Sequence, residues 1–398
     1  SRAAVLIHGR IVTGPVAFDL RYPTPRRGHA ERAGSVGVGR NRHIRSEPAR
    51  LRPVDDIPDR PGRSRQCEPS TLCNDGTCPY AEGCDSTHNP VFTVDQQGSD
   101  TLMNPLGEQR PPHSSATRFA STDVWVRDIR QVIEDAIARA QPTDGKVTLV
   151  GYSLGALRVG RALDAAKFPE IVSRVNRVAF LSPVFGGPTE ETRPAGGFVT
   201  FPLALIERPE VVESDRMPNP ERDAVFTGHR IDGSTDYAWT QLMDHDVVGR
   251  SWGGTDPGHP AGVLRSPTFS SYGWNTDVAA QLVPPTLVMQ ELDDTDIPGG
   301  TGNAPAIYHS LPTSMTNKVL VRLDCATHAM MWEGCSNVAR CIPDSGIPYG
   351  RPPERRWAGP HSTIKTALIE WITNGTFDHA PIGKFIVDAS GVARPQRA

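Results

Sequence analysis

A serine flanked by two glycines, placed where a buried strand would meet a helix, restricts the fold of this chain more than any other feature. Residues 146–150 form a mostly apolar run typical of a buried strand, and the motif Gly151-x-Ser153-x-Gly155 follows it. Small and apolar residues then recur at helical spacing over residues 154–166. The glycines permit a tight turn from strand to helix, which would hold the Ser153 hydroxyl out at the carboxyl edge of a sheet.

Strands and helices are expected to alternate on both sides of this segment. The expected strands are Ala3–Ile7, 177–181, 286–290 and Lys318–Leu323, and the further expected helices are 123–140 and 362–373. This alternation predicts the α/β class, with a mostly parallel sheet and helices on both of its faces. Residues 379–398 show no strong pattern and are expected to be peripheral.

The domain organisation follows from where this alternation breaks. Residues 186–284 are rich in proline and glycine and are predicted to form an inserted cap or lid. The core would then consist of residues 1–185 and 285–398. Its first part carries an irregular, basic, cysteine-containing insertion at about residues 24–90.

Positive charge is concentrated in the first part of the chain. Residues 1–66 hold 14 Arg and 6 Asp or Glu, a net charge of +8, so the remaining residues carry −11 of the total of −3. Residues 24–66 lack apolar periodicity and are expected to be loop or disorder. Three interpretations remain open: a natural insertion, which could bind an acidic surface, a degenerate core element, or a stretch read in a foreign frame.

Composition excludes several classes of protein. The chain has no run of 18 apolar residues, so no membrane span is expected. A net charge of −3 is too close to neutral for a dedicated nucleic-acid binder. The sequence also lacks a dinucleotide fingerprint, a P-loop and convincing metal-ligand spacing, so we expect no cofactor and no metal. Oligomeric state is left open.

The seven cysteines suggest an oxidising compartment. Four of them cluster, two form a close pair and one is left over: Cys67, Cys73, Cys78 and Cys84; Cys335 and Cys341; Cys325. We expect three disulfides, one of them Cys335–Cys341 and two within the cluster, with a buried free thiol, and therefore a secreted or periplasmic protein. Zinc binding and free thiols are the alternatives, but the cluster spacing lacks the C-x2-C pairs of common structural zinc sites.

A serine hydroxyl needs a general base and an orienting carboxylate to act as a nucleophile. His328 is the candidate base, because it lies just after the expected strand Lys318–Leu323 and would reach the same sheet edge. Three aspartates compete as the carboxylate after the expected strand 286–290: Asp293, Asp294 and Asp296. Their spacing to Pro298 favours Asp294.

An oxyanion at the reacting carbonyl would need backbone N–H donors. The amide of Leu154, directly after the serine, is one candidate, and the amide of Arg10, in the turn after Ala3–Ile7, is the other. His8 in the same turn is expected to shape the turn rather than to accept a proton.

These residues resemble, in type and order, the α/β-hydrolase superfamily. The resemblance rests on His8-Gly9, the motif around Ser153, Asp294 and His328, and covers about residues 1–20 and 85–375. It implies a mostly parallel α/β-hydrolase sheet with a cap, and a secreted bacterial serine esterase or lipase. Ser153 would be the nucleophile, His328 the base and then the acid, and Asp294 the orienting carboxylate.

The chain departs from the superfamily pattern before residue 123. A helix and a strand ending in a Gly-x-Gly turn are expected there, and only residues 91–94 offer a weak substitute for the strand. The expected function is cleavage of a small-molecule carboxylic ester through an acyl-serine intermediate. The alternatives are an amidase, lactonase, acyltransferase or perhydrolase on the same triad, and a non-catalytic binding protein on the hydrolase fold.

Overall fold

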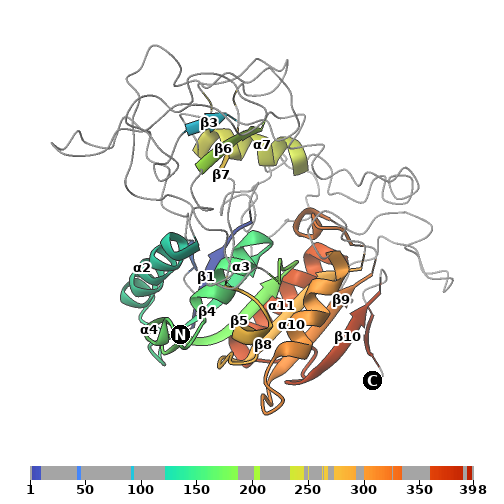
Figure 1. Cartoon of the computed structure of the whole chain (residues 1–398). Coiled ribbons are helices and arrows are strands. Elements are labelled where there is room, and N and C mark those ends of the chain that lie inside the picture. The colour runs from blue at the N-terminus through green and yellow to red at the C-terminus, as the bar shows by residue number, and fades with distance from the viewer. Residues whose placement is uncertain are drawn as a thin grey trace, which may run out of the picture.

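The computed structural model describes an α/β core with further elements above it (Figure 1). The residues described are 2–9, 43–45, 91–93, 122–186, 201–206, 234–245, 250, 262, 264–267, 273–292, 300–324, 326–333, 359–388 and 392–396. Several sequence predictions fall outside them: the oxyanion residue Arg10, the three candidate aspartates Asp293, Asp294 and Asp296, and all seven cysteines with their expected disulfides.

The core is an eight-stranded sheet in the order β11-β10-β9-β8-β5-β4-β1-β2. Its strands are β1 (Ala3–Ile7), β2 (His43–Arg45), β4 (Val147–Tyr152), β5 (Val175–Leu181), β8 (Thr286–Glu291), β9 (Lys318–Leu323), β10 (Gly383–Val387) and β11 (Ala393–Pro395). All neighbouring strands pair in parallel except β10 and β11. The predicted α/β class with a mostly parallel sheet is confirmed.

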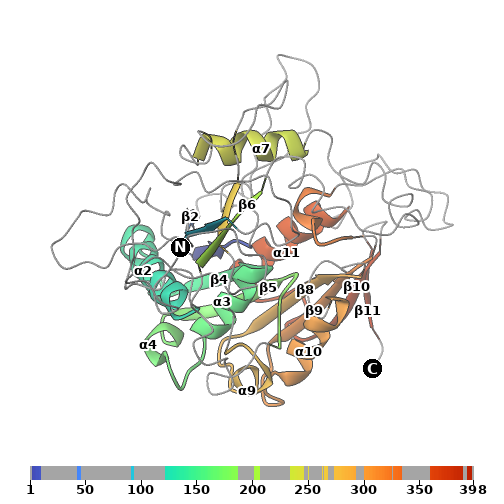
Figure 2. The ribbon, with the colours of Figure 1, turned by 45° about the horizontal axis from the view of Figure 1, so that its top comes forward.

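Helices cover both faces of this sheet (Figure 2). The strands divide their side chains between two apolar clusters, as the two-residue period of a strand requires. One cluster joins the strands to α2 (Thr122–Ala140), α3 (Leu154–Ala162), α9 (Thr276–Ala279) and α10 (Asn303–Ser310), and the other joins them to α11 (Pro360–Asn374). Alternation is clear in β1, where Val5 belongs to the first cluster and Leu6 to the second.

Helix α3 is shorter than its sequence pattern predicts. We expected it to run to residue 166, but it ends at Ala162, and Asp164 explains the difference. The Asp164 Oδ1 atom accepts hydrogen bonds from the backbone N–H groups of Ala166 (3.1 Å) and Lys167 (3.3 Å), while Oδ2 pairs with Arg161 at 3.1 Å. Side-chain acceptors of this kind compete with the helical hydrogen-bond pattern and turn the chain.

The expectation that residues 379–398 are peripheral is wrong. β10 pairs in parallel with β9, and Phe385 and Val387 are only 7% and 2% exposed. The sequence signal was weak because the remaining residues of this short strand are only half-buried, so the strand lacks a continuous apolar run.

The basic segment contributes one strand to the sheet. β2 (His43–Arg45) lies parallel beside β1, so the expectation of loop over residues 24–66 is wrong at these three positions. Residues 91–94 do not replace the missing core strand, because β3 (Val91–Thr93) pairs instead with β6 (Phe201–Ile206) in a separate sheet, β3-β6-β7. A strand of three residues carries no detectable periodicity, so the sequence did not show β2, and for β3 it did not show which sheet the strand joins.

The separate sheet and α7 (Ser234–His245) lie above the core in Figure 1, with β7 (Leu264–Pro267) completing the sheet. Residues 273–292 lie on the core itself. Trp274 is fully buried, its ring 5.1 Å from that of Phe180, and any side chain at Gly160 would collide with it. Within the described residues, no helix is both long and apolar enough to span a membrane.

Candidate active site

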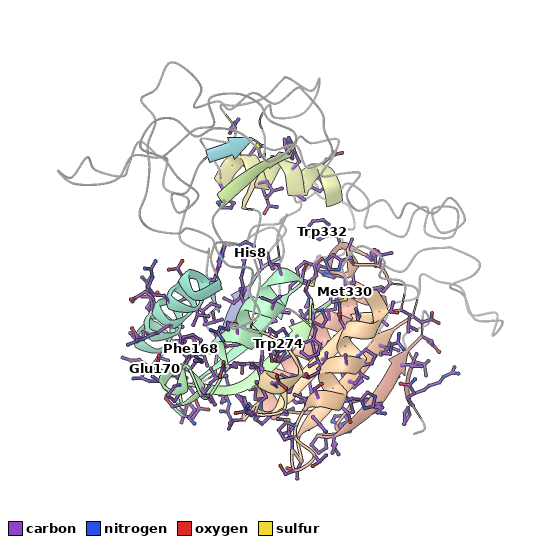
Figure 3. The ribbon with its side chains drawn as sticks, viewed as in Figure 1. His8, Phe168, Glu170, Trp274, Met330 and Trp332 are labelled. Atoms are coloured by element: carbon purple, nitrogen blue, oxygen red, sulfur yellow. The ribbon has the colours of Figure 1, made fainter. Side chains whose placement is uncertain are left out.

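Five strands of the core deliver polar residues to one edge of the sheet. Glu291 is the last residue of β8, and the other four polar residues follow the strands β1, β4, β5 and β9: His8, Ser153, Ser182 and His328, in that order. Parallel strands place their carboxyl ends together, and ligands of open α/β sheets bind at that edge. Figure 3 shows His8, Met330 and Trp332 on the side of the core that faces α7, away from Phe168 and Glu170.

Ser153 occupies a strained turn between β4 and α3. Its backbone angles, φ 54° and ψ −123°, are rarely adopted by residues other than glycine. The neighbouring glycines are required for steric reasons. A Cβ atom at Gly155 would lie 2.2 Å from the Ile7 carbonyl oxygen, and one at Gly9 would lie 2.9 Å from the Ser153 Cβ atom. Close packing of β1 against this turn therefore fixes the position of the hydroxyl.

The structure brings the two central predicted residues together. The Ser153 Oγ atom lies 2.9 Å from the Nε2 atom of His328, a distance at which the hydroxyl donates to the imidazole. Ser153 is 7% exposed, and the His328 side chain is 16% exposed. The pair is therefore largely shielded from water but still reachable.

A buried carboxylate faces the other nitrogen of the His328 ring. Glu291, the last residue of β8, has an Oε1 atom 3.4 Å from His328 Nδ1 and is fully buried. Its Oε2 atom accepts a hydrogen bond of 2.6 Å from the hydroxyl of Ser182. Ser182 itself has a positive φ of 43° and donates its backbone N–H to the Met289 carbonyl. The carboxylate thus has a fixed orientation toward the imidazole.

Glu291 was missed from the sequence, where Asp294 was favoured for the same role. Asp294 lies outside the described residues, so its assignment stays a prediction. The available signal for Glu291 was its place: it is an acidic residue that directly follows the expected strand 286–290 and is buried with that strand. A Glu side chain is seldom fully buried unless it is paired, so a buried acidic residue at a strand end indicates a partner nearby.

Tyr152, the residue before the serine, contacts the histidine twice. Its hydroxyl donates to the His328 carbonyl oxygen at 2.5 Å, and the two rings stack with centroids 5.4 Å apart and planes 22° apart. The sequence motif leaves this position free, so nothing in the pattern indicated the contact. Tyr152 links the turn that carries the nucleophile to the loop that carries the histidine.

Of the two candidate oxyanion donors, Leu154 is among the described residues and Arg10 is not. Leu154 is the first residue of α3, so its backbone N–H has no partner within the helix and lies at the positive end of the helix dipole. In the turn after β1, the Nδ1–H of the buried His8 donates to the Gly9 carbonyl at 2.7 Å, consistent with a role in shaping the turn. Within the described residues, no group of three or more His, Cys, Asp or Glu side chains could hold a metal ion.

A mostly parallel sheet in this strand order, a strained serine turn after a central strand and a histidine after a later strand define the α/β-hydrolase fold. No protein-family model and no curated protein matches the chain.

Several solved structures are similar to the chain. One is a bromoperoxidase from Bacillus anthracis, with 14% identity over 83% of this chain and 86% of that chain and a TM-score of 0.34. Another is naproxen esterase from Bacillus subtilis, with 10% identity over 84% and 79% and a TM-score of 0.38. A third is a lipase-esterase related protein from Clostridium acetobutylicum, with 11% identity over 83% and 88% and a TM-score of 0.37.

Proposed function

We propose that the protein is a serine hydrolase that cleaves a carboxylic ester through an acyl-serine intermediate. The observation that carries the proposal is the 2.9 Å contact between Ser153 Oγ and His328 Nε2, with a buried carboxylate on the far side of the ring. A hydroxyl alone is a weak nucleophile, and this arrangement supplies the base and the orienting group that it lacks.

Each residue has a defined task in the two half-reactions. Ser153 Oγ attacks the ester carbonyl carbon while its proton passes to His328 Nε2, and the resulting oxyanion faces the N–H of Leu154. When the tetrahedral intermediate collapses, the alcohol leaves with the proton from His328. A water molecule, deprotonated by the same imidazole, then attacks the acyl-serine. The carboxylic acid leaves as the bond to Oγ breaks, and His328 returns the proton to Ser153 Oγ.

In this proposal Glu291 keeps the Nδ1 proton of His328 in place and stabilises the imidazolium that forms. The sequence expectation for this task, Asp294, is the competing assignment. Because Glu291 is fully buried and held by Ser182, it needs no rearrangement of the surrounding residues to act.

A fluorophosphonate probe tests the proposal directly. The wild-type protein should be labelled on Ser153 and should hydrolyse short p-nitrophenyl esters, while Ser153→Ala should lose both properties. A panel of esters varied in acyl and alcohol size, run on both proteins, would then define the substrate. Labelling or turnover that survives in Ser153→Ala would refute the proposal.

A further inference from the structure

A second buried carboxylate lies close to the histidine along the chain. Glu333 is 2% exposed and is five residues after His328. Both of its carboxylate oxygens are used by one residue, Thr327, which directly precedes the histidine. Oε2 accepts the Thr327 backbone N–H at 2.9 Å, and Oε1 accepts a hydrogen bond from the Thr327 hydroxyl.

The same threonine also binds the residue that follows the histidine. Its Oγ1 atom accepts the backbone N–H of Ala329 at 3.1 Å, and its carbonyl accepts the N–H of Met330 at 3.0 Å. The residues on both sides of His328 are thus joined through one hydroxyl to one carboxylate. Thr327 is 5% exposed, so these bonds are made away from water.

The loop of residues 326–333, which carries His328, is attached to α11 at its far end. The Glu333 carbonyl accepts the backbone N–H of His361 at 2.9 Å, and the Met331 carbonyl accepts the Nδ1–H of the His361 ring at 2.7 Å. Trp332 lies between these two points and Met330 just before them, and both are buried on the rim that faces α7 (Figure 3). The carboxylate of Glu333 therefore works from a fixed position.

Burying a carboxylate to close a short loop is costly, and hydrogen bonds only partly offset that cost. Desolvation of an ionised carboxylate opposes folding, and an apolar pair of similar volume would often close the loop at lower cost. The bonds of Glu333 instead restrict the backbone on both sides of His328. The imidazole needs this restriction, since a displacement of about 1 Å in a catalytic group can cost about 100-fold in rate.

We propose that Glu333 and Thr327 are positioning residues for His328, holding its Nε2 atom within hydrogen-bond distance of Ser153 Oγ. The proposal rests on the proposed serine-hydrolase function and adds a second carboxylate to it. Glu291 acts on the ring of the histidine, and Glu333 acts on the backbone that presents the ring.

A matched pair of variants at Thr327 tests the proposal. Thr327→Val removes the hydroxyl at constant shape, and Thr327→Ser retains it. We expect Thr327→Val to lower both kcat on a short p-nitrophenyl ester and the rate constant of fluorophosphonate labelling by about 10- to 100-fold per folded molecule, with KM within about twofold. Thr327→Ser should stay within about threefold of wild type.

Two variants of the carboxylate provide a second route if Thr327→Val does not fold. Glu333→Gln turns one acceptor into a donor that faces another donor, and we expect it to behave like Thr327→Val. Glu333→Asp keeps the charge but retracts it, and should give an intermediate loss of kcat. Circular dichroism and urea unfolding would establish the folded fraction of each protein.

The possible failures are distinguishable. If the folded Thr327→Val or Glu333→Gln protein is labelled and turns over at the wild-type rate while only its unfolding midpoint falls, Glu333 is merely structural and the positioning proposal is overturned. In that case the serine-hydrolase function stands. If the wild-type protein is neither labelled nor active on any ester, the proposed function fails and the positioning proposal falls with it.

Discussion

The nucleophile and the histidine reach the same sheet edge by different physical means. The turn that carries Ser153 is fixed by backbone contacts: Gly155 packs against the carbonyls of β1, and Gly9 leaves room for the serine. The loop that carries His328 is fixed by polar side chains, with Thr327 and Glu333 binding the backbone. One side of the site depends on the absence of side chains and the other on buried polar groups.

This difference decides how each side tolerates change. A turn held by close backbone packing fails when any atom is added, because main-chain atoms cannot move without separating β1 from α3. A loop held by hydrogen bonds keeps its fold when one partner is altered conservatively, but loses the accuracy with which it places the imidazole. Substitutions on the two sides should therefore separate stability from catalysis.

The largest effect is expected at the carboxylate that faces the histidine ring. Glu291→Gln should lower kcat by about 10³-fold, because an amide can no longer hold the required tautomer or stabilise the imidazolium. Asp294→Asn is the matched control and should retain activity within about threefold. Steady-state kinetics on a p-nitrophenyl ester measures both. A larger loss in Asp294→Asn than in Glu291→Gln would assign the role to Asp294. The 3.4 Å contact between Glu291 Oε1 and His328 Nδ1 would then not contribute to catalysis.

On the nucleophile side, Gly155→Ala should destabilise the fold by about 3 kcal/mol or more, since its methyl group would overlap the Ile7 carbonyl oxygen. Gly302→Ala is the control, because nothing lies within 4 Å of a Cβ atom there. Its free energy of unfolding should change by less than about 1 kcal/mol. Urea unfolding monitored by circular dichroism compares the two, and equal stabilities would contradict the steric account of the turn.

Tyr152 connects the two sides, and its hydroxyl should have an intermediate effect. Tyr152→Phe keeps the ring that stacks on His328 but loses the hydrogen bond to the His328 carbonyl. We expect kcat to fall about tenfold, with a change in unfolding free energy of about 1 kcal/mol. Kinetics and urea unfolding on the same preparation measure both quantities. Full retention of kcat would show that stacking alone aligns the two segments.

The smallest effect concerns pH and the anchor at α11. Burial lowers the pKa of His361, with a smaller contribution in the same direction from Lys365, against an opposing hydrogen bond to the Met331 carbonyl. The pKa of His361 is lower in the folded than in the unfolded protein, so protonation of this residue favours unfolding. The free energy of unfolding is therefore unaffected by His361 above about pH 6.5 and falls as the pH drops through the folded pKa. The loss in unfolding free energy on acidification should be smaller in His361→Asn. An unchanged loss would assign the pH dependence to other groups.

The sequence predicted the side of the site that depends on backbone sterics. Glycine is the residue that such a turn requires, so the pattern around Ser153 carried the information, and the apolar runs of β4, β8 and β9 placed it in a parallel sheet. The polar residues that hold and orient His328 could not be predicted as well. Many Asp, Glu and Thr residues follow strands, and only folding shows that Glu291 and Glu333 are the ones buried near His328.

Elements with weak sequence signals were also missed for physical reasons. β2 has only three residues, and β10 is partly buried without a continuous apolar run. Pairing with β1 and β9 places these two strands in the sheet. The end of α3 at Ala162 depended on the Asp164 side chain, which competes with the helix only when its neighbours are in place. In each case a tertiary interaction overrode a weak local preference.

The pairing of β1 with β4 has a consequence for how the chain is made. Ala3 pairs with Val147, 144 positions later (147 minus 3), so a strand whose five residues are all buried has to wait for its main partner. At synthesis rates of about 5–20 residues per second, that delay is about 7–30 s. Throughout it an apolar segment stays without its final cover, and long-range pairing of this kind slows folding. The nascent chain should therefore be most prone to aggregation in the interval before β4 has emerged from the ribosome.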